Sequence, residues 1–226
     1  MRTTDMADEL FSGAAQPLPA GVRLATARHG GVTVTRVEIA REGLSRPRGR
    51  YVTLEMPSVS VLDERDAAVI EVCARELRAL LPPEGPVLVL RPVAAVAPGV
   101  AAATGLSLQQ LAAALVGQLR PAAVVCVDSL CSAEGQRLGR TVQFSDSGLY
   151  PAQADHTRHL TRDTLGVPVV AAGIPTLMQA QEGADLVVTP RALDSVIAHG
   201  AALLAGSVNR ALQPRLTVQQ LCWLTG

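Results

Sequence analysis

The chain has 226 residues, 48% of them hydrophobic and 18% charged, which is enough apolar sequence to bury one large core. Its 20 basic residues balance its 20 acidic ones, which excludes the basic field that gathers nucleic acid or an anionic membrane. Every basic residue is Arg. The absence of Lys excludes Schiff-base chemistry and a P-loop lysine.

The cysteines and the apolar segments indicate a soluble protein of one domain. The four cysteines are Cys73, Cys126, Cys131 and Cys222. They form no Cys-x-x-Cys pair and three lie in apolar sequence, which is typical of buried, unreactive thiols. The N-terminus lacks the apolar stretch of a signal peptide, and proline and glycine interrupt the Ala-rich segment 93–103, which disfavours a membrane span. We therefore expect a cytoplasmic protein with a flexible segment over 1–19 and one α/β domain over 20–226.

The first third of the chain predicts a small β extension followed by a helix. Val32–Ile39 alternates apolar and polar residues, and Arg50–Glu55 follows a basic turn, so the two segments are expected to pair as an antiparallel hairpin. Asp63 is placed to cap a helix from about Glu64 to Leu81, which two prolines end. Pro86–Leu90 has the composition of a short buried strand.

Helix signals occur at four further places. Ser107 begins a capping box for a helix over Leu108–Leu119. The link 128–140 has room only for a short helix, and Asp155–Leu165 is a loop or a short helix. Thr189, followed by proline, predicts the start of a helix that runs to about Leu212. Thr217 with Gln220 caps a last short helix.

Three short apolar runs in the middle of the chain predict the core of the sheet. They are Ala122–Val127, Thr141–Phe144 and Val167–Ala172, and each ends in a polar or glycine-rich turn. Runs of this length and composition are typical of parallel strands buried on both faces. Asp128 and Asp146 follow the first two runs, and open α/β sheets hold catalytic groups at the carboxyl ends of their strands. We therefore expect both carboxylates to open into one cleft.

Each of these carboxylates also has a structural interpretation. Asp128 is a candidate catalytic or metal-binding carboxylate, or else the N-cap of a short helix. Asp146 lies in a Ser-Asp-Ser-Gly sequence, where an Asp side chain often binds its own backbone in a turn. Residue type and position leave both alternatives open.

Other chemistries find weaker support in the sequence. His156 and His159 have the spacing of one helix face, but the segment is polar and no third ligand is obvious, so a solvated loop is favoured over a metal site. Ser129 lacks the Gly-x-Ser-x-Gly motif of serine hydrolases. No Gly-x-Gly-x-x-Gly motif follows Pro86–Leu90, so a dinucleotide cofactor is not expected.

An ordered set of short motifs resembles one protein family. The motifs are Gly49–Glu55, Arg91–Val93, Val96–Val100, Thr104–Gly105, Val127–Leu130, Gln143–Gly148, Leu165–Thr176 and Val187–Pro190, followed by a helix that ends near Asn209. In this order, over most of the chain, they resemble the spore germination proteases, which cleave small acid-soluble spore proteins during germination. Any one motif is unspecific, and the collinear set carries the resemblance.

The resemblance implies a fold, an activity and partners. The fold would be that of the hydrogenase-maturation proteases, a three-layer α/β arrangement with a mostly parallel sheet and helices on both faces. The activity would be that of an atypical aspartic-type endopeptidase without a cofactor, with Asp128 as a catalytic residue. The substrates would be small acid-soluble spore proteins in the spore core, and the assembly a homo-tetramer. Thr4–Ala7 is similar to the self-processing motif of the family precursor, which suggests a propeptide cut between Asp5 and Met6.

The chain departs from the family at one catalytic motif. The family is built around two Asp residues, of which one matches Asp128. The second belongs to a Thr-Pro-Asp-Ala-Leu-Gly-Pro motif that is missing here, because Val87–Leu90 runs straight into Arg91. A further family segment is missing between Thr176 and Val187. A lone Asp128 with an ordinary pKa would be ionised at neutral pH and could not serve as both acid and base.

Three hypotheses follow. The chain is a divergent endopeptidase of this family in which Asp146 supplies the second carboxylate beside Asp128. Alternatively, it is a catalytically inactive relative with a binding or regulatory role, or a metal-dependent hydrolase unrelated to spores. The motif coverage favours the endopeptidase.

Overall fold

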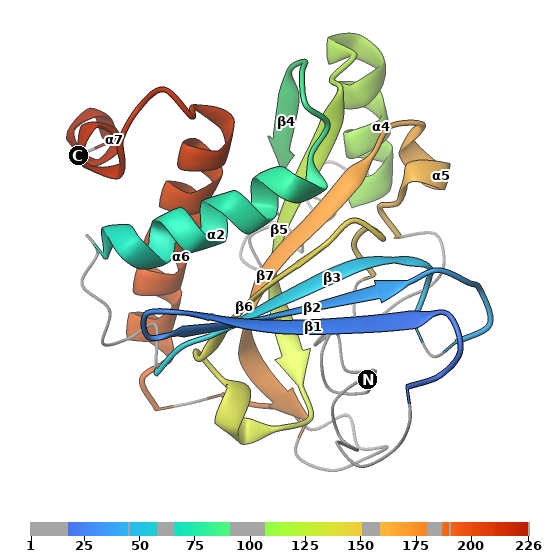
Figure 1. Cartoon of the computed structure of the whole chain (residues 1–226). Coiled ribbons are helices and arrows are strands. Elements are labelled where there is room, and N and C mark those ends of the chain that lie inside the picture. Colours follow the sequence, from blue (N-terminus) through green and yellow to red (C-terminus); the bar gives the residue numbers. More distant parts are fainter. Residues whose placement is uncertain are drawn as a thin grey trace.

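A single mixed sheet forms the centre of the computed structural model, which describes residues 18–44, 46–57, 66–90, 107–150, 159–179, 187–189 and 191–225. The strand order is β1-β2-β3-β6-β7-β5-β4, with β8 paired to β7 (Figure 1). The strands are β1 (Val22–His29), β2 (Val32–Ile39), β3 (Gly49–Glu55), β4 (Val87–Leu90), β5 (Ala123–Ser132), β6 (Thr141–Ser145), β7 (Val169–Gln179) and β8 (Val187–Val188). The helices are α2 (Ala67–Leu80), α4 (Leu108–Leu119), α5 (Arg162–Leu165), α6 (Leu193–Leu212) and α7 (Val218–Thr225).

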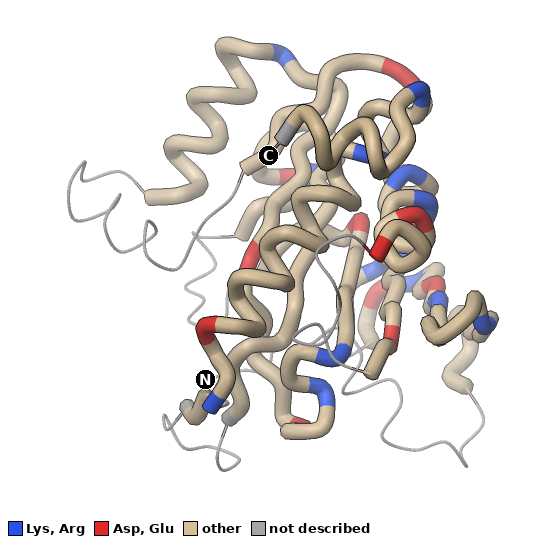
Figure 2. The backbone as a smooth tube through the Cα atoms, turned by 90° about the vertical axis from the view of Figure 1, so that its left-hand side faces the viewer, with Lys and Arg blue, Asp and Glu red and all other residues tan. Residues whose placement is uncertain are grey.

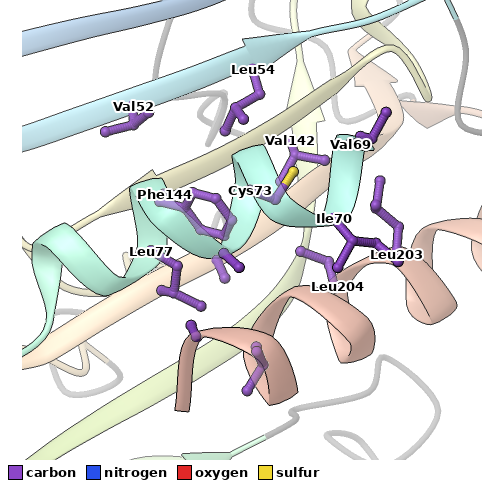
Figure 3. Packing of buried hydrophobic residues seen from close by; sticks show 14 of the residues in the cluster. Val52, Leu54, Val69, Ile70, Cys73, Leu77, Val142, Phe144, Leu203 and Leu204 are labelled. Carbon is purple, nitrogen blue, oxygen red and sulfur yellow. The ribbon is translucent and has the colours of Figure 1, made fainter. Parts of the chain in front are cut away.

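Helices cover both faces of the sheet. Helices α2, α6 and α7 lie on one face, and α4 and α5 on the other (Figure 1). Each face has its own cluster of buried apolar side chains, because the central strands are apolar at successive positions. Phe144 lies fully buried under α2, close to Leu77 and Cys73 (Figure 3). The expected α/β class with three layers is confirmed.

Parallel pairing is confined to β4, β5 and β7, and this corrects one expectation. Strand β6 runs antiparallel to both of its neighbours, β3 and β7, so the prediction of a parallel strand at Thr141–Phe144 was wrong. The reason is the length of the link. Only the eight residues 133–140, with a single 3-10 turn at Gly135–Arg137, separate β5 from β6. A parallel crossover needs a dozen or more residues.

The N-terminal β extension is an antiparallel meander. The expected hairpin of β2 and β3 is confirmed, with Val37 opposite Tyr51, and β3 joins the meander to β6. The sequence pattern missed β1, which pairs with β2 along its whole length. Most side chains of β1 are at least partly exposed, so this edge strand lacks the alternation that identifies β2.

The first two long helices begin at side-chain caps. Helix α2 begins after Asp66, whose side chain accepts a hydrogen bond from the backbone N–H of Val69. Its cap is therefore Asp66 rather than Asp63, which lies outside the described residues. The capping box of α4 is confirmed, since the Ser107 hydroxyl and the Gln110 amide each bind the other residue's backbone.

The C-terminal helices are mostly as predicted. Helix α6 ends at Leu212 as expected but begins at Leu193, later than the start predicted after Thr189. The last helix follows Thr217, whose hydroxyl binds the N–H of Gln220 as predicted. Within the described ranges, none of these helices combines the length and the apolar character that a membrane span requires.

Glu76 on α2 joins this helix to the meander, and its replacement by Gln gives a first prediction. The side chain is 4% exposed and binds Arg36 of β2 at 2.6 and 2.7 Å. Burial opposes ionisation, but hydrogen bonds from Arg36 and Arg75 outweigh it and hold the pKa of Glu76 below its usual value. We expect Glu76→Gln to lower the free energy of unfolding at pH 7 by about 2 kcal/mol in urea denaturation.

The pH dependence and a matched control make this prediction specific. Because the folded-state pKa of Glu76 is lowered, its stabilising contribution is present above the unfolded-state pKa of about 4.3. It is lost as the pH falls through the lower folded-state value, so the difference between wild type and variant should shrink in acid. Glu38 forms an exposed pair with Arg23 at 3.6 Å, and Glu38→Gln should change stability little. An equal loss in both variants would contradict the assignment.

Candidate active site

Asp128 lies inside β5, at a step in the sheet. The strand does not end at Val127 as predicted but continues to Ser132, so Asp128 caps no helix. On one side β4 ends at Leu90, in register with Cys126. On the other side β7 continues alongside, with Gly173 in register with Asp128. Asp128 therefore lies just past the carboxyl end of β4 rather than past the end of its own strand.

The environment of Asp128 changes its acidity. Its Oδ1 atom accepts a hydrogen bond of 2.7 Å from the backbone N–H of Ser129. Burial raises the pKa of Asp128 to about 6, against the opposing effect of that hydrogen bond. The condition of an ordinary pKa, under which Asp128 would be fully ionised at neutral pH, therefore does not hold. A carboxyl whose pKa lies near the working pH is suited to accept a proton and then to return it.

The thiol nearest in sequence is not a competing nucleophile. Burial raises the pKa of Cys126 to about 12, and the charge of Asp128 adds to the effect. Cys73 and Cys131 are also buried. Burial raises the pKa of Cys73 to about 12 as well. Since the thiolate is the reactive form of cysteine, both thiols are inert, as predicted.

Two hydroxyl groups lie beside this step. The Ser129 hydroxyl on β5 and the Thr176 hydroxyl on β7 are hydrogen-bonded to each other across the two strands. They meet close to the irregularity in the β5–β7 register between Leu130 and Cys131. Asp128, Ser129 and Thr176 all line one pocket of about 350 Å³. Ser129 was predicted from the sequence only as a possible nucleophile. Thr176 was not predicted as a site residue, because the partner strand was expected to end at Ala172.

Asp146 lies elsewhere and has a different partner. Its two carboxylate oxygens accept hydrogen bonds from the backbone N–H and the Nε of Arg50, each at 2.6 Å. Gln143 is in register with Gly173 and thereby with Asp128. Asp146 lies three residues after Gln143, just past the end of β6, which is two strands away from β5. It is therefore roughly 10 Å from Asp128 along the strands and roughly 10 Å across them. The structure does not bring the two carboxylates together.

Of the remaining sequence candidates, His159 lies in the part of the chain that the structure describes. The His159 ring packs edge-on against Tyr150, with 4.7 Å between ring centroids. His156, Asp5 and Met6 lie outside the described residues. Among the residues that the structure describes, no three His, Cys, Asp or Glu side chains gather as a metal site would require.

Comparison with known proteins identifies relatives of one kind. A family model described as germination protease matches residues 81–182, which include Asp128 and Thr176. The germination protease of Clostridium perfringens strain SM101 is 26% identical, over 84% of this chain and 87% of its own. The germination protease of Bacillus velezensis is 28% identical over 82% of this chain and 62% of its own length. The germination protease of Halalkalibacterium halodurans is 37% identical over 48% of this chain and 28% of its own length.

The alignments also bear on the missing segments. The alignment with the Clostridium perfringens protein runs over 287 positions, although it uses only 84% of a 226-residue chain. The relative therefore contains segments that have no counterpart here, in agreement with the two deletions found in the sequence. The chain is thus similar to germination proteases over most of its length, and it lacks segments that the relative contains.

Proposed function

We propose that this protein is an endopeptidase that degrades small acid-soluble spore proteins, with Asp128 as its catalytic carboxylate. The observation that carries the proposal is the placement of Asp128. It lies in the region matched by the family, at the step where β4 ends, and burial raises its pKa to about 6. The names of the relatives support the activity. The substrate class follows from the motif resemblance.

The chemistry proposed for Asp128 is that of a single carboxyl in two roles. Its ionised form takes a proton from a water molecule as the water oxygen attacks the peptide carbonyl carbon. Its protonated form then gives that proton to the amide nitrogen as the C–N bond breaks. With a pKa near 6, the Asp128 carboxylate is a stronger base toward water than an ordinary carboxylate and is still mostly ionised at neutral pH. This is an atypical aspartic-type mechanism that does not need Asp146.

The hydroxyl pair is proposed to assist this step. When Ser129 and Thr176 bind each other, one O–H group is used in the bond and the other is left to donate. Because both line the same pocket as Asp128, that second O–H can bind the carbonyl oxygen on which negative charge develops.

The other features implied by the resemblance are proposals as well. We infer a homo-tetramer acting in the cytoplasm of the spore core, and removal of the first five residues by a cut between Asp5 and Met6. Light scattering of the purified protein tests the assembly. Mass spectrometry of the mature N-terminus tests the cut.

The decisive experiment is digestion of a small acid-soluble spore protein by the purified chain beside its Asp128→Asn variant. Cleavage by the wild type that is lost in the variant supports the proposal. Equal cleavage by both points to a different site. No cleavage by either, with or without the first five residues, favours an inactive relative with a binding role.

Asp146→Asn tests whether the second candidate carboxylate contributes to catalysis. Because Asp146 binds Arg50 and lies far from Asp128, we expect its replacement to leave kcat/KM within about threefold of the wild type. The Asn side chain keeps an acceptor for the backbone N–H of Arg50, so the fold is expected to persist. Loss of activity comparable to that of Asp128→Asn would restore the two-carboxylate hypothesis.

A further inference from the structure

Strand β5 has an open edge where β4 stops. Beyond Leu90, the last residue of β4, none of the described strands pairs with that side of β5. Residues 123–126 and 130–132 of β5 are buried, but Val127, Asp128 and Ser129 are partly exposed. These three residues form the open edge, and their outward backbone groups have no strand partner among the described residues.

The N–H group of Ser129 points out of the open edge. The carbonyl oxygen of Asp128 points toward β7, where a Cβ atom on Gly173 would lie 2.7 Å from it. In a trans peptide unit the C=O group and the N–H group that follows it point in opposite directions. The N–H of Ser129 therefore faces away from β7, toward the side on which β4 has ended. The carbonyl oxygen of Val127 faces the same side, because backbone groups alternate along a strand.

Asp128 itself provides a partner for this N–H group. Its Oδ1 atom accepts the hydrogen bond of 2.7 Å from the backbone N–H of Ser129. The carboxylate oxygen thus takes the place that a main-chain carbonyl oxygen of a neighbouring strand would take. The carboxyl of Asp128 and an added strand therefore compete for the same donor.

We propose that the main chain of the peptide substrate adds to the open edge as a short strand, and that its carbonyl oxygen displaces the Asp128 carboxylate from the N–H of Ser129. The inference rests on the proposed function. A substrate residue that lies opposite Asp128 and continues the line of β4 donates its N–H to the carbonyl oxygen of Val127. Its own C=O accepts the hydrogen bond from Ser129. The displaced carboxylate is then free to take the proton of water, so binding of the substrate releases the base.

The surroundings offer the displaced carboxylate no basic partner. Asp128 is the one charged residue among the described residues that line the pocket under α6. The acidic and basic residues of α6 lie only near its ends (Figure 2). A carboxylate that leaves Ser129 therefore stays unpaired beside the bound peptide.

The size of the open edge favours a peptide over a second copy of the chain. Three strand residues span roughly 10 Å, which is sufficient for the two hydrogen bonds to one peptide residue. A stable interface between two proteins buries at least about 1,200 Å². An edge of three residues does not provide such an area by itself.

N-methylated peptides test whether the main chain of the substrate docks at this edge. Overlapping short peptides of one small acid-soluble spore protein are screened by fluorescence anisotropy against the full chain carrying Asp128→Asn, which separates binding from cleavage. The peptide that binds most tightly is then N-methylated at one amide at a time. Methylation of the amide that faces Val127 should weaken binding about tenfold, and methylation of the amide on either side should change it less than about twofold.

A pair of variants tests the displacement. Asp128→Asn keeps an oxygen that accepts from the N–H of Ser129, whereas Asp128→Ala leaves this donor free. The same peptide should therefore bind about three- to tenfold more tightly to Asp128→Ala. Asp146→Asn and Asp146→Ala, compared on the Asp128→Asn background, are the matched control, because Asp146 also accepts from a backbone N–H, that of Arg50, and lies far from the open edge. These two should bind the peptide equally, and circular dichroism verifies that each variant is folded.

The outcomes separate this inference from the proposed function. One sensitive amide together with tighter binding to Asp128→Ala supports the docking and the displacement. The inference is overturned if no peptide binds, if no amide is sensitive, or if Asp128→Ala binds no more tightly than Asp128→Asn, while cleavage by the wild type still supports the endopeptidase. The supporting pattern without any cleavage by the wild type keeps the docking and overturns the proposed activity. Peptide affinity that falls as the protein concentration rises would show that a second copy takes this edge, and would also overturn the inference.

Discussion

Replacing Asp128 by Asn is expected to abolish cleavage of small acid-soluble spore proteins and to make the folded protein more stable at neutral pH. The activity should fall by at least about 10³-fold, because the amide can neither accept the proton of the attacking water nor return it. The Asn side chain keeps an acceptor for the N–H of Ser129, which Asp128 binds at 2.7 Å. The local geometry should therefore survive the change.

The gain in stability follows from the pKa of the buried carboxyl. In the folded protein the pKa of Asp128 is raised to about 6, whereas in the unfolded chain it is about 3.9. The folded state therefore holds its proton more tightly, and stability falls as the pH rises from about 4 through about 6. Because the side chain is not fully enclosed, we expect the cost above pH 7 to be roughly 2 kcal/mol.

Urea denaturation at several pH values measures this cost. At pH 8 the Asp128→Asn variant should be more stable than the wild type by roughly 2 kcal/mol, and at pH 4 the difference should vanish. Asp146→Asn is the matched control and should show no such gain, because Asp146 is paired with Arg50. If the variant were less stable than the wild type at pH 8, burial of the ionised Asp128 would not lower the free energy of unfolding.

The pH dependence of cleavage tests the single-carboxyl mechanism. Because the free enzyme needs the ionised form of Asp128 to accept the proton of water, kcat/KM should rise with pH to a plateau, with its midpoint near 6. Two carboxylates that share a proton would instead give a bell-shaped profile with an acidic optimum. A bell-shaped profile would mean that a second acidic group takes part.

The parts of the fold that depend on local sequence were predictable. The three apolar runs and the capping box at Ser107 depend on neighbouring residues, and each run overlaps one of the strands β5, β6 and β7. Strands β5 and β7 continue beyond the ends predicted at Val127 and Ala172. The direction of β6 was predicted wrongly as parallel, because strand direction depends on which end of the sheet the link reaches. The sequence predicts a link over 128–140, and only the continuation of β5 to Ser132 shortens it to 133–140, which is too short for a parallel crossover.

The candidate site was predictable only in part, for the same reason. The Val-Asp-Ser-Leu motif identified Asp128, but its burial depends on β5 continuing through a polar pair to Leu130 and Cys131, which are both buried. The Ser129–Thr176 contact joins two strands that are distant in the sequence. The pocket depends on where α6 crosses the sheet, and no periodicity within one helix contains that information.

Gly173 on β7 controls the position of Asp128, and Gly173→Ala is expected to damage both stability and activity. A Cβ atom at this position would lie 2.7 Å from the carbonyl oxygen of Asp128 and 2.7 Å from Cγ of Leu130. A backbone oxygen cannot move away without moving β5. We expect the free energy of unfolding to fall by about 2–3 kcal/mol in urea denaturation, which is typical of overpacking.

The effect of Gly173→Ala on activity should exceed its effect on the amount of folded protein. A displacement of about 1 Å at a catalytic group can cost about 10²-fold, so kcat/KM should fall at least about tenfold under conditions where the variant is fully folded. Gly117→Ala is the matched control, because a Cβ there meets nothing within 4 Å and Ala favours the helix α4. That variant should be as stable as the wild type or more so, with unchanged activity. If Gly173→Ala were also neutral, β5 and β7 would not be packed tightly enough at this point to hold Asp128, and the geometry on which the single-carboxyl mechanism depends would have to come from elsewhere.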